Sequence, residues 1–390
     1  MAESSVFFEI SNRIIGKGHP CFIIAEIGQN HQGDLETAKK MILQAKECGV
    51  DCVKFQRSHL PAKFTKAALG RPYSSLNSFG ATYGEHKMFL EFSQSDFREL
   101  KRFSEEEVGI IFGVSAMDEV ALEELLDMGV AFVKIGSGDA NNFPLIRKAR
   151  DARRPLIIST GMQNDGVIER IYSTMQGRAF GLLHCVSSYP TEVQDVNLQH
   201  IKGFQEKFPK AVIGYSGHEL NGLVSVVAVA MGASILERHF TLDKNLQGSD
   251  HKCSLEPPEM TRLVKNVRKV EEYLNKQNQG ATLNTFEELA SLLDHLEVLP
   301  EEDREPLKSA LIGENERKLL KCEEECYRKL GKSLVYARNI TSGEELTEND
   351  LTIKVSHPKG IPPEDFEQIL GRKLTKPVEA DTPIQESDFL

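Results

Sequence analysis

Two histidines in this 390-residue chain stand where a metal ion could be bound. His218 directly follows the apolar run AVIGYSG, and His239 ends the run SILERH. Two imidazoles at neighbouring strand ends suit a divalent metal whose other coordination positions stay open to water and substrate. Such a metal polarises a carbonyl oxygen as a Lewis acid. The pattern alone leaves a second interpretation open, in which both rings are ordinary core histidines with satisfied hydrogen bonds.

Two lysines, Lys54 in DCVKFQ and Lys134 in AFVKIGSGD, occupy similar positions. A lysine that is buried without a partner is unfavourable, so each indicates either a bound anion or a salt bridge at the rim of the fold. Ammonium groups beside hydroxyl groups bind carboxylates and phosphates. The hydroxyl donors predicted for such an anion site are Ser137, Ser159 and Ser216.

Two carboxylates belong to the same pattern, Glu26 in FIIAEIGQ and Asp250 in GSDH. A carboxylate at a strand end or on the loop that follows can act as a general acid or base. A salt bridge at the rim is the alternative for each of them.

These candidates share one position, because most stand where a short apolar run of strand length ends. Such runs end at Glu26, Lys54, Lys134, Ser159 with Thr160, Tyr189, Ser216 with His218, and His239. Segments with helical periodicity lie between them, such as LETAKKMILQAKECG and LNGLVSVVAVAMGA. Alternating strands and helices of this length predict an α/β fold, a (β/α)8 TIM barrel, which presents its active site at the carboxyl ends of its strands.

The composition along the chain predicts three units. The barrel is expected over residues 1–275, ending with the charged helix PPEMTRLVKNVRKVEEYL. Residues 276–322 are acidic and helix-prone without strand-like runs, so we interpret them as a helical linker or insert, in which no chemistry is visible. Residues 323–390 form a small β-rich domain, in which SLVYARNI and LTIKV are predicted strands.

Charge and composition limit the partners. Fifty-eight acidic and 47 basic residues give a net charge of −11, which argues against nucleic acid as a partner. An anionic substrate must therefore meet a local cluster of basic side chains. The seven cysteines are scattered, and no apolar stretch reaches the ~20 residues that a membrane span needs. The N-terminus does not resemble a signal sequence. Together these features predict a cytoplasmic protein without a membrane partner.

Longer segments of the chain resemble a known family. IAEIGQNHQGD, VKFQ, TYGEH, VKIGSGDANNFP, GYSGHE, LERHFTLD and GSDHKCSLEP stand in the order and spacing of the N-acetylneuraminate (sialic acid) synthases, and the tail resembles their antifreeze-like (SAF) domain. The resemblance covers nearly the whole chain except the linker and is strongest to the animal members. It implies condensation of phosphoenolpyruvate with N-acetylmannosamine 6-phosphate, giving N-acetylneuraminate 9-phosphate and inorganic phosphate.

The resemblance also implies a role for each candidate residue. His218 and His239 would bind Mn²⁺ or Mg²⁺, and Glu26 would lie near the enol carbon of phosphoenolpyruvate. Asp250 would hold the sugar and the metal-bound groups. The residues expected to bind the two substrates are Lys54, Gln56, Lys134, Ser137, Asp139, Ser159, Thr160, Ser187, Tyr189 and Ser216. Two of these differ from many bacterial members, which have Asn in place of Ser187 and Glu in place of Asp139.

A phosphate on the sugar would need further cations. Lys63, Arg71 and Lys87, in the long loop after the second strand-like run, are the candidates.

The C-terminal domain of family members swaps across a homodimer and lays a loop over the partner's active site. In the bacterial enzymes this loop supplies an arginine, but here it reads IKVSHPKGIPP and contains none. Lys354 or Lys359 is the expected substitute, of which we favour Lys359, although lysine cannot form the planar bidentate contact of arginine. The resemblance therefore implies a domain-swapped homodimer.

Three other functions stay open at this point. The acceptor could be unphosphorylated N-acetylmannosamine. Lys134 could be the Schiff-base lysine of a metal-independent pyruvate aldolase. The chain could also be a non-enzymatic carbohydrate-binding protein, although a degenerate barrel should have lost some of its candidate catalytic residues.

Overall fold

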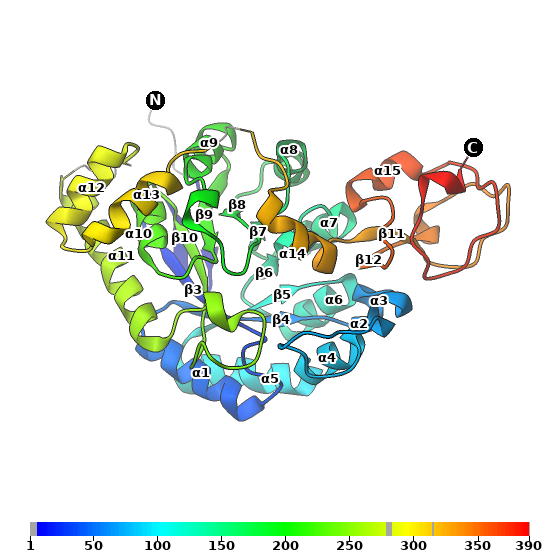
Figure 1. Cartoon of the computed structure of the whole chain (residues 1–390), viewed down its shortest axis with the longest axis horizontal. Coiled ribbons are helices and arrows are strands. Elements are labelled where there is room, and N and C mark those ends of the chain that lie inside the picture. Colours follow the sequence, from blue (N-terminus) through cyan, green and yellow to red (C-terminus); the bar gives the residue numbers. More distant parts are fainter. Residues whose placement is uncertain (1–5, 278–282, 314–315, 390) are drawn as a thin grey trace.

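Eight parallel strands form a closed barrel in a computed structural model that describes residues 6–277, 283–313 and 316–389 (Figure 1). Their order around the barrel is β10-β3-β4-β5-β6-β7-β8-β9. The strands are β3 (Phe22–Gly28), β4 (Cys52–Arg57), β5 (Ile111–Ala116), β6 (Val133–Ile135), β7 (Leu156–Ser159), β8 (Phe180–Cys185), β9 (Ala211–Gly217) and β10 (Ile235–His239). The predicted TIM barrel is thus confirmed.

Helices follow every strand and surround the barrel (Figure 1). The outer helices are α1 (Leu35–Glu47), α5 (Gln94–Arg102), α6 (Glu119–Met128), α7 (Phe143–Asp151), α8 (Asp165–Thr174), α9 (Gln199–Lys207), α10 (Leu223–Ala230) and α11 (Pro257–Gln277). Three short helices, α2 (Leu60–Lys63), α3 (Lys66–Gly70) and α4 (Tyr83–Leu90), lie in the long connection between β4 and α5. Asp34 and Asp118 cap α1 and α6 by accepting backbone N–H bonds of Thr37 and Ala121.

Strand β5 was missing from the predicted runs, because it ends in small residues and its one hydroxyl, Ser115, does not interrupt an apolar pattern. Among the described residues, no helix is both long and apolar enough to cross a membrane.

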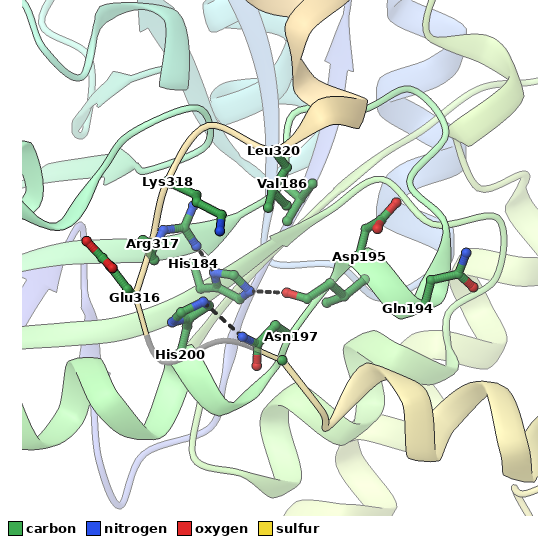
Figure 2. A pocket seen from close by; sticks show the side chains of 12 residues that line it. His184, Val186, Gln194, Asp195, Asn197, His200, Glu316, Arg317, Lys318 and Leu320 are labelled. Carbon is green, nitrogen blue, oxygen red and sulfur yellow. Dashed lines mark hydrogen bonds between the residues drawn. The ribbon is translucent and has the colours of Figure 1, made fainter.

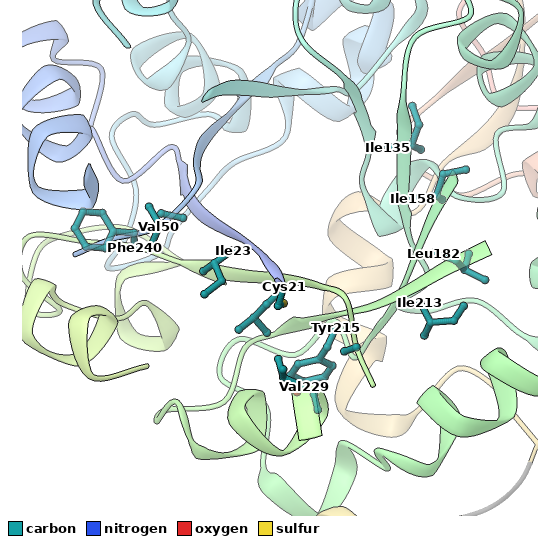
Figure 3. Packing of buried hydrophobic residues seen from close by; sticks show 14 of the residues in the cluster. Cys21, Ile23, Val50, Ile135, Ile158, Leu182, Ile213, Tyr215, Val229 and Phe240 are labelled. Atoms are coloured by element: carbon teal, nitrogen blue, oxygen red, sulfur yellow. The ribbon is translucent and has the colours of Figure 1, made fainter. Parts of the chain in front are cut away.

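Both faces of the barrel strands are apolar near their amino ends. Outward-facing residues such as Ile23, Ile158 and Ile213 pack in the large cluster between strands and helices (Figure 3). The inner face belongs to a separate cluster that a hairpin of β1 (Phe7–Ile10) and β2 (Arg13–Gly16) joins through two fully buried isoleucines, Ile10 and Ile15. The barrel is therefore packed at its base, and its interior is polar only towards the carboxyl ends of the strands.

The C-terminal third continues from the barrel through helices into a small β unit. Helices α12 (Phe286–His295) and α13 (Arg304–Ala310) bury leucines in the outer cluster of the barrel. Helix α14 (Glu324–Leu330) leads to an antiparallel pair, β11 (Ser333–Tyr336) and β12 (Leu351–Lys354), and to α15 (Phe366–Ile369), around a core of their own. Both predicted C-terminal strands are found, while the division into three units at residues 275 and 322 stays a prediction.

Candidate active site

A cavity of about 430 Å³ opens at the carboxyl ends of the barrel strands. Of the residues favoured for catalysis, for the metal and for the two substrates, all but Thr160 and Lys359 line it, whereas the further candidates Arg71 and Lys354 do not. The predicted residues in its wall are Glu26, Lys54, Gln56, Lys134, Ser137, Asp139, Ser159, Ser187, Tyr189, Ser216, His218, His239 and Asp250.

The alternation of side chains along a strand explains why these residues meet. On β10, Ile235 belongs to the apolar interior of the barrel, while Glu237 and His239 line the cavity above it. Between them, Arg238 points outward and forms a fully buried ion pair with Glu219 at 2.6 Å. Residues two apart share a strand face, so the inner face of β10 changes from apolar to polar towards the cavity. The same alternation brings Lys54 and Gln56 of β4 to one side.

Lys54 is buried in a network of charged and polar groups. Its Nζ lies 2.5 Å from Oε2 of Glu26 and donates a hydrogen bond to Oγ of Ser115 at 2.9 Å. Oε2 of Glu237 is 3.7 Å away. Burial alone would lower the pKa of Lys54, but the carboxylates of Glu237 and Glu26 outweigh burial and raise it. Lys54 is therefore an ammonium group at neutral pH.

Lys134 is the second buried lysine of the cavity. Its Nζ donates to Oγ of Ser159 at 2.7 Å and lies 3.7 Å from Oε1 of Glu237. Burial lowers the pKa of Lys134 by more than Glu237 raises it.

Glu237 stands between the two lysines and accepts a hydrogen bond from Ser216 at 3.2 Å. Although burial alone would raise its pKa, Lys134 and Lys54 lower the pKa of Glu237 to about 2.

Glu237 and Ser115 were not predicted as site residues. Glu237 precedes His239 by two positions in the run ILERH, so strand periodicity could have placed both on the same face. Ser115 lies on β5, the strand that the apolar runs did not indicate.

Hydroxyl groups form another part of the cavity wall. The backbone N–H of Gly161 donates to Oγ of Ser137 at 3.0 Å. A Cβ at position 161 would lie 2.1 Å from Oγ of Ser187 and 2.9 Å from that of Ser137, so a larger residue there would displace these two hydroxyls. Oγ of Ser187 is buried and has no hydrogen-bond partner in the described part of the chain. A bound ligand with acceptor oxygens would satisfy it.

The two predicted metal-binding histidines lie next to each other in the cavity wall, with ring centroids 5.3 Å apart. Nδ1 of His218 lies 2.8 Å from the carbonyl oxygen of Val186, which can only accept, so Nδ1 holds the proton and Nε2 has the free lone pair. Nδ1 of His239 is buried without a hydrogen-bond partner among the described residues and lies 3.9 Å from Oδ2 of Asp250. Burial lowers the pKa of both rings, which favours the neutral form that binds metals.

The donor set fits a sparsely liganded divalent ion. Within residues 6–277, 283–313 and 316–389, no group of three or more His, Cys, Asp and Glu side chains is arranged to hold a metal. Two imidazoles would therefore need water or substrate oxygens to complete the coordination.

The predicted sugar-binding residues surround these histidines. The Tyr189 ring lies 4.1 Å from that of His218, and Gln56 donates to Oε1 of Glu26 at 2.8 Å. Asp139 lines the cavity but pairs with Lys332 from the start of the C-terminal β unit.

Two predicted residues lie outside the cavity. Thr160 is fully buried, and its hydroxyl donates to the carbonyl oxygen of Leu183 at 2.9 Å. It follows Ser159 directly, so it points to the opposite face of the strand. Lys359 donates to the carbonyl oxygen of Gly331 within the C-terminal unit, and burial lowers its pKa to about 8.

The end of the predicted linker and helix α14 form part of the cavity wall, although no chemistry was predicted for the linker. Cys322, Cys326 and Lys329 line the cavity. The fully buried carboxylate of Glu323 accepts backbone N–H bonds of Met162 at 2.7 Å and Ser187 at 2.8 Å, just beyond β7 and β8.

A smaller cavity of about 180 Å³ lies behind the same strand ends (Figure 2). Arg317 is buried there and donates to the carbonyl oxygens of Thr160 and Cys185, both at 3.0 Å. A further N–H contacts Nδ1 of His184 at 2.6 Å, while the Nε2 side of that ring bonds the carbonyl oxygen of Val196. Arg317 and Glu323 thus attach the segment to β7 and β8 from two sides.

Known proteins share both the sequence and the fold. Residues 41–279 match the NeuB family and residues 331–390 match the SAF domain. The N-acetylneuraminate-9-phosphate synthase of Homo sapiens is 47% identical over 376 residues, which cover 96% of this chain and 94% of the human protein. The Drosophila melanogaster protein of the same name is 48% identical over 93% of this chain and 94% of its own length.

Solved structures agree with these relatives. Spore coat polysaccharide biosynthesis protein spsE from Bacillus subtilis has a TM-score of 0.78 at 28% identity, covering 99% of each chain. The N-acetylneuraminic acid (sialic acid) synthetase from Leptospira borgpetersenii has a TM-score of 0.62 at 32% identity, covering 76% of this chain and 99% of that one. With its barrel, its strand-end cavity and these matches, the chain belongs to the NeuB family, the sialic acid synthases, and has a C-terminal SAF domain.

Proposed function

We propose that this protein condenses phosphoenolpyruvate with N-acetylmannosamine 6-phosphate to give N-acetylneuraminate 9-phosphate and inorganic phosphate. One observation supports this most: two buried lysines, Lys54 and Lys134, line the same cavity as two neighbouring histidines. The names of the human and Drosophila relatives support a phosphorylated product. They do not favour the free sugar as acceptor, the Schiff-base aldolase or the non-enzymatic protein.

Phosphoenolpyruvate fits the deep part of the cavity. Its carboxylate and phosphate need several cations and hydrogen-bond donors in a small volume. Lys54 and Lys134 provide the charge, and Ser137, Ser159 and the unpartnered hydroxyl of Ser187 provide donors. With water excluded, these fixed dipoles and charges stabilise the anion more strongly than solvent does.

Glu26 is the proposed acid–base residue. Its carboxylate is fixed by Lys54 and Gln56, so it lies beside the proposed anion site in a single orientation. In the reaction, C3 of phosphoenolpyruvate forms a bond to the aldehyde carbon of the open-chain sugar. Water then adds to C2, and its proton passes to Glu26. The C2–O bond to phosphate then breaks, the C2 hydroxyl passes its proton to the departing phosphate, and the ketone of the product remains. The proton held by Glu26 goes to the former aldehyde oxygen, which becomes a hydroxyl group of the product.

His218 and His239 would hold Mn²⁺ or Mg²⁺, with Asp250 next to His239. When bound, the ion supplies Lewis-acid polarisation of the sugar aldehyde. The hydrogen bond between His218 Nδ1 and Val186 fixes the ring with Nε2 available, and Tyr189 packs against that ring.

The assembly and the location of the protein are also proposals. We propose a cytoplasmic homodimer in which the C-terminal domain of one subunit reaches the active site of the other, as the family resemblance implies. Lys359 and Lys354 bond within their own C-terminal unit, so a contact with a substrate would have to come from the exchanged arrangement.

The first prediction concerns the acceptor. With phosphoenolpyruvate and Mn²⁺, the protein should release phosphate when N-acetylmannosamine 6-phosphate is added, and at least about tenfold more slowly with the free sugar, since a charged group contributes roughly 1.5–3 kcal/mol of binding. A colorimetric phosphate assay measures this. Release with neither sugar would refute the proposed function. Trapping of pyruvate by borohydride together with insensitivity to EDTA would point to the Schiff-base aldolase.

The second prediction concerns the metal. Replacing His218 or His239 by alanine should abolish tight Mn²⁺ binding, which electron paramagnetic resonance detects without turnover. Activity should fall by roughly 100-fold or more, because Lewis-acid stabilisation amounts to several kcal/mol. The exposed His19 offers a matched control, and His19→Ala should leave both readouts unchanged. Unaltered Mn²⁺ binding in both cavity variants would contradict the assignment.

The third prediction concerns the charge of Glu237. Burial already lowers the pKa of Lys134, and Glu237 opposes that shift, so Glu237→Gln should lower the pKa of Lys134 further. Lys134 then loses its proton at lower pH. The alkaline limb of the pH profile of kcat/KM for phosphoenolpyruvate should move down by about one pH unit or more. The exposed Glu272 provides the control Glu272→Gln, and an alkaline limb at the wild-type position would argue against this role.

The fourth prediction concerns assembly. Light scattering coupled to size exclusion should give twice the mass of one chain. A mixture of one subunit inactivated by Lys134→Ala and another truncated after Lys332 should regain activity, if the C-terminal domain of one subunit acts at the active site of the other. A monomeric mass at assay concentrations would exclude the exchanged arrangement.

A further inference from the structure

The mouth of the cavity contains a second pair of lysines, separate from Lys54 and Lys134. Lys63 ends helix α2 and Lys87 lies on α4, both in the connection between β4 and α5, and both side chains line the cavity. Arg71 of the same connection does not line it, because its guanidinium stacks 4.2 Å above the ring of Tyr83.

Lys63 is only 3% exposed, yet among the described residues no carboxylate oxygen lies within 4.0 Å of its Nζ. Its contacts are neutral: Oγ of Ser58 at 3.4 Å and Sδ of Met117 at 3.1 Å. The nearby carboxylate of Glu91 pairs with Arg57 instead. Burial, followed by the charge of Lys87, lowers the pKa of Lys63 to about 7. A buried ammonium of this kind is unfavourable unless an anion accompanies it.

Lys87 is half-buried and also has no carboxylate partner. Its Nζ donates to Oε1 of Gln29 at 2.8 Å and lies 5.6 Å from the ring centre of Tyr83, with no described carboxylate oxygen within 4.0 Å. The other lysines of the cavity each have a carboxylate partner: Lys54 has Glu26, Lys134 has Glu237, and Lys329 has Glu325. In a chain with a net charge of −11, two neighbouring lysines without such partners indicate an anion site.

The backbone of Lys63 is held by the C-terminal unit. Its carbonyl oxygen accepts the N–H of Val355, directly after β12, at 2.8 Å, and the N–H of Thr65 bonds the carbonyl oxygen of Val355 at 3.0 Å. A side chain on such a paired segment is preorganised, so a ligand bound there does not have to order it.

The surroundings of this lysine pair identify the part of the substrate that it would meet. The charges of Lys63 and Asp139 influence each other, as do those of Lys87 and Asp250. These two aspartates flank the region proposed for the sugar, whereas Lys54 and Lys134 serve phosphoenolpyruvate. Further hydrogen-bond donors of the same connection line the cavity there, namely Tyr73, Ser75 and Asn77.

We propose that Lys63 and Lys87 form the binding site for the phosphate group of the sugar acceptor and thereby determine the preference for a phosphorylated sugar. This inference rests on the proposed function, because it concerns the second substrate of that reaction. A dianionic phosphate between two ammonium groups gains charge-assisted hydrogen bonds that a free hydroxyl group cannot form.

The test compares Lys63→Gln and Lys87→Gln with wild type, using both N-acetylmannosamine 6-phosphate and N-acetylmannosamine. The ratio of kcat/KM for the phosphorylated sugar to that for the free sugar should fall at least about tenfold in each variant, while KM for phosphoenolpyruvate changes less than about twofold. Calorimetric titration with the sugar phosphate, without phosphoenolpyruvate, should show a matching loss of affinity. The exposed Lys66 of the same connection provides the control Lys66→Gln, for which the ratio should stay at the wild-type value.

The outcomes separate this inference from the proposed function. If wild type prefers the phosphorylated sugar and the two variants retain that ratio, the lysine site is refuted and the reaction stands. An equal loss with both sugars also counts against it. If wild type releases phosphate with neither sugar, the reaction itself is refuted. Lys87→Gln keeps the test decisive should Lys63→Gln lower the melting temperature, because Lys87 lies nearer the surface.

Discussion

The site depends on burying two lysines close together at the mouth of the barrel. Lys54 and Lys134 cannot both stay charged there without Glu237, whose carboxylate lies 3.7 Å from each Nζ. The pKa of Lys54 is raised and that of Lys134 is lowered, because Lys54 has a second carboxylate partner, Glu26, at 2.5 Å. The cavity thus combines a permanently charged lysine with one whose charge depends on its neighbours. This arrangement requires an interior that is apolar below and polar above, and the strand register provides it.

Much of the fold and site could be predicted because strand ends have a local signature. Apolar runs that stop at Lys54, Lys134, Ser159 or His239 are visible in sequence, and barrel closure then brings their ends together. This signature does not show which of two adjacent residues at a strand end faces the cavity. Ser159 and Thr160 are adjacent and chemically alike, yet only the first faces the cavity, and the sequence does not show where the inward alternation stops.

Other site residues could not be predicted because distant parts of the chain place them. Glu323 and Arg317 bond backbone groups after β7 and β8 across more than 130 positions, and nothing in their local sequence indicates that they support the strand ends beside the cavity. Loop residues raise the same difficulty. The sequence does not distinguish Lys63, Arg71 and Lys87, but in the structure Arg71 packs against Tyr83 and does not line the cavity. The roles of the individual site residues stay predictions until they are tested.

The bonds of Glu323 to Met162 and Ser187 have a consequence for how this protein can be divided. A piece that stopped at the end of α11 would contain every barrel strand but would lose the carboxylate that orders two of the loops at their ends. It would also lack Lys332, which neutralises the buried Asp139. A piece that keeps these two contacts has to extend past the barrel to at least residue 332, and exchange of C-terminal modules between relatives can preserve them only at a junction beyond that point.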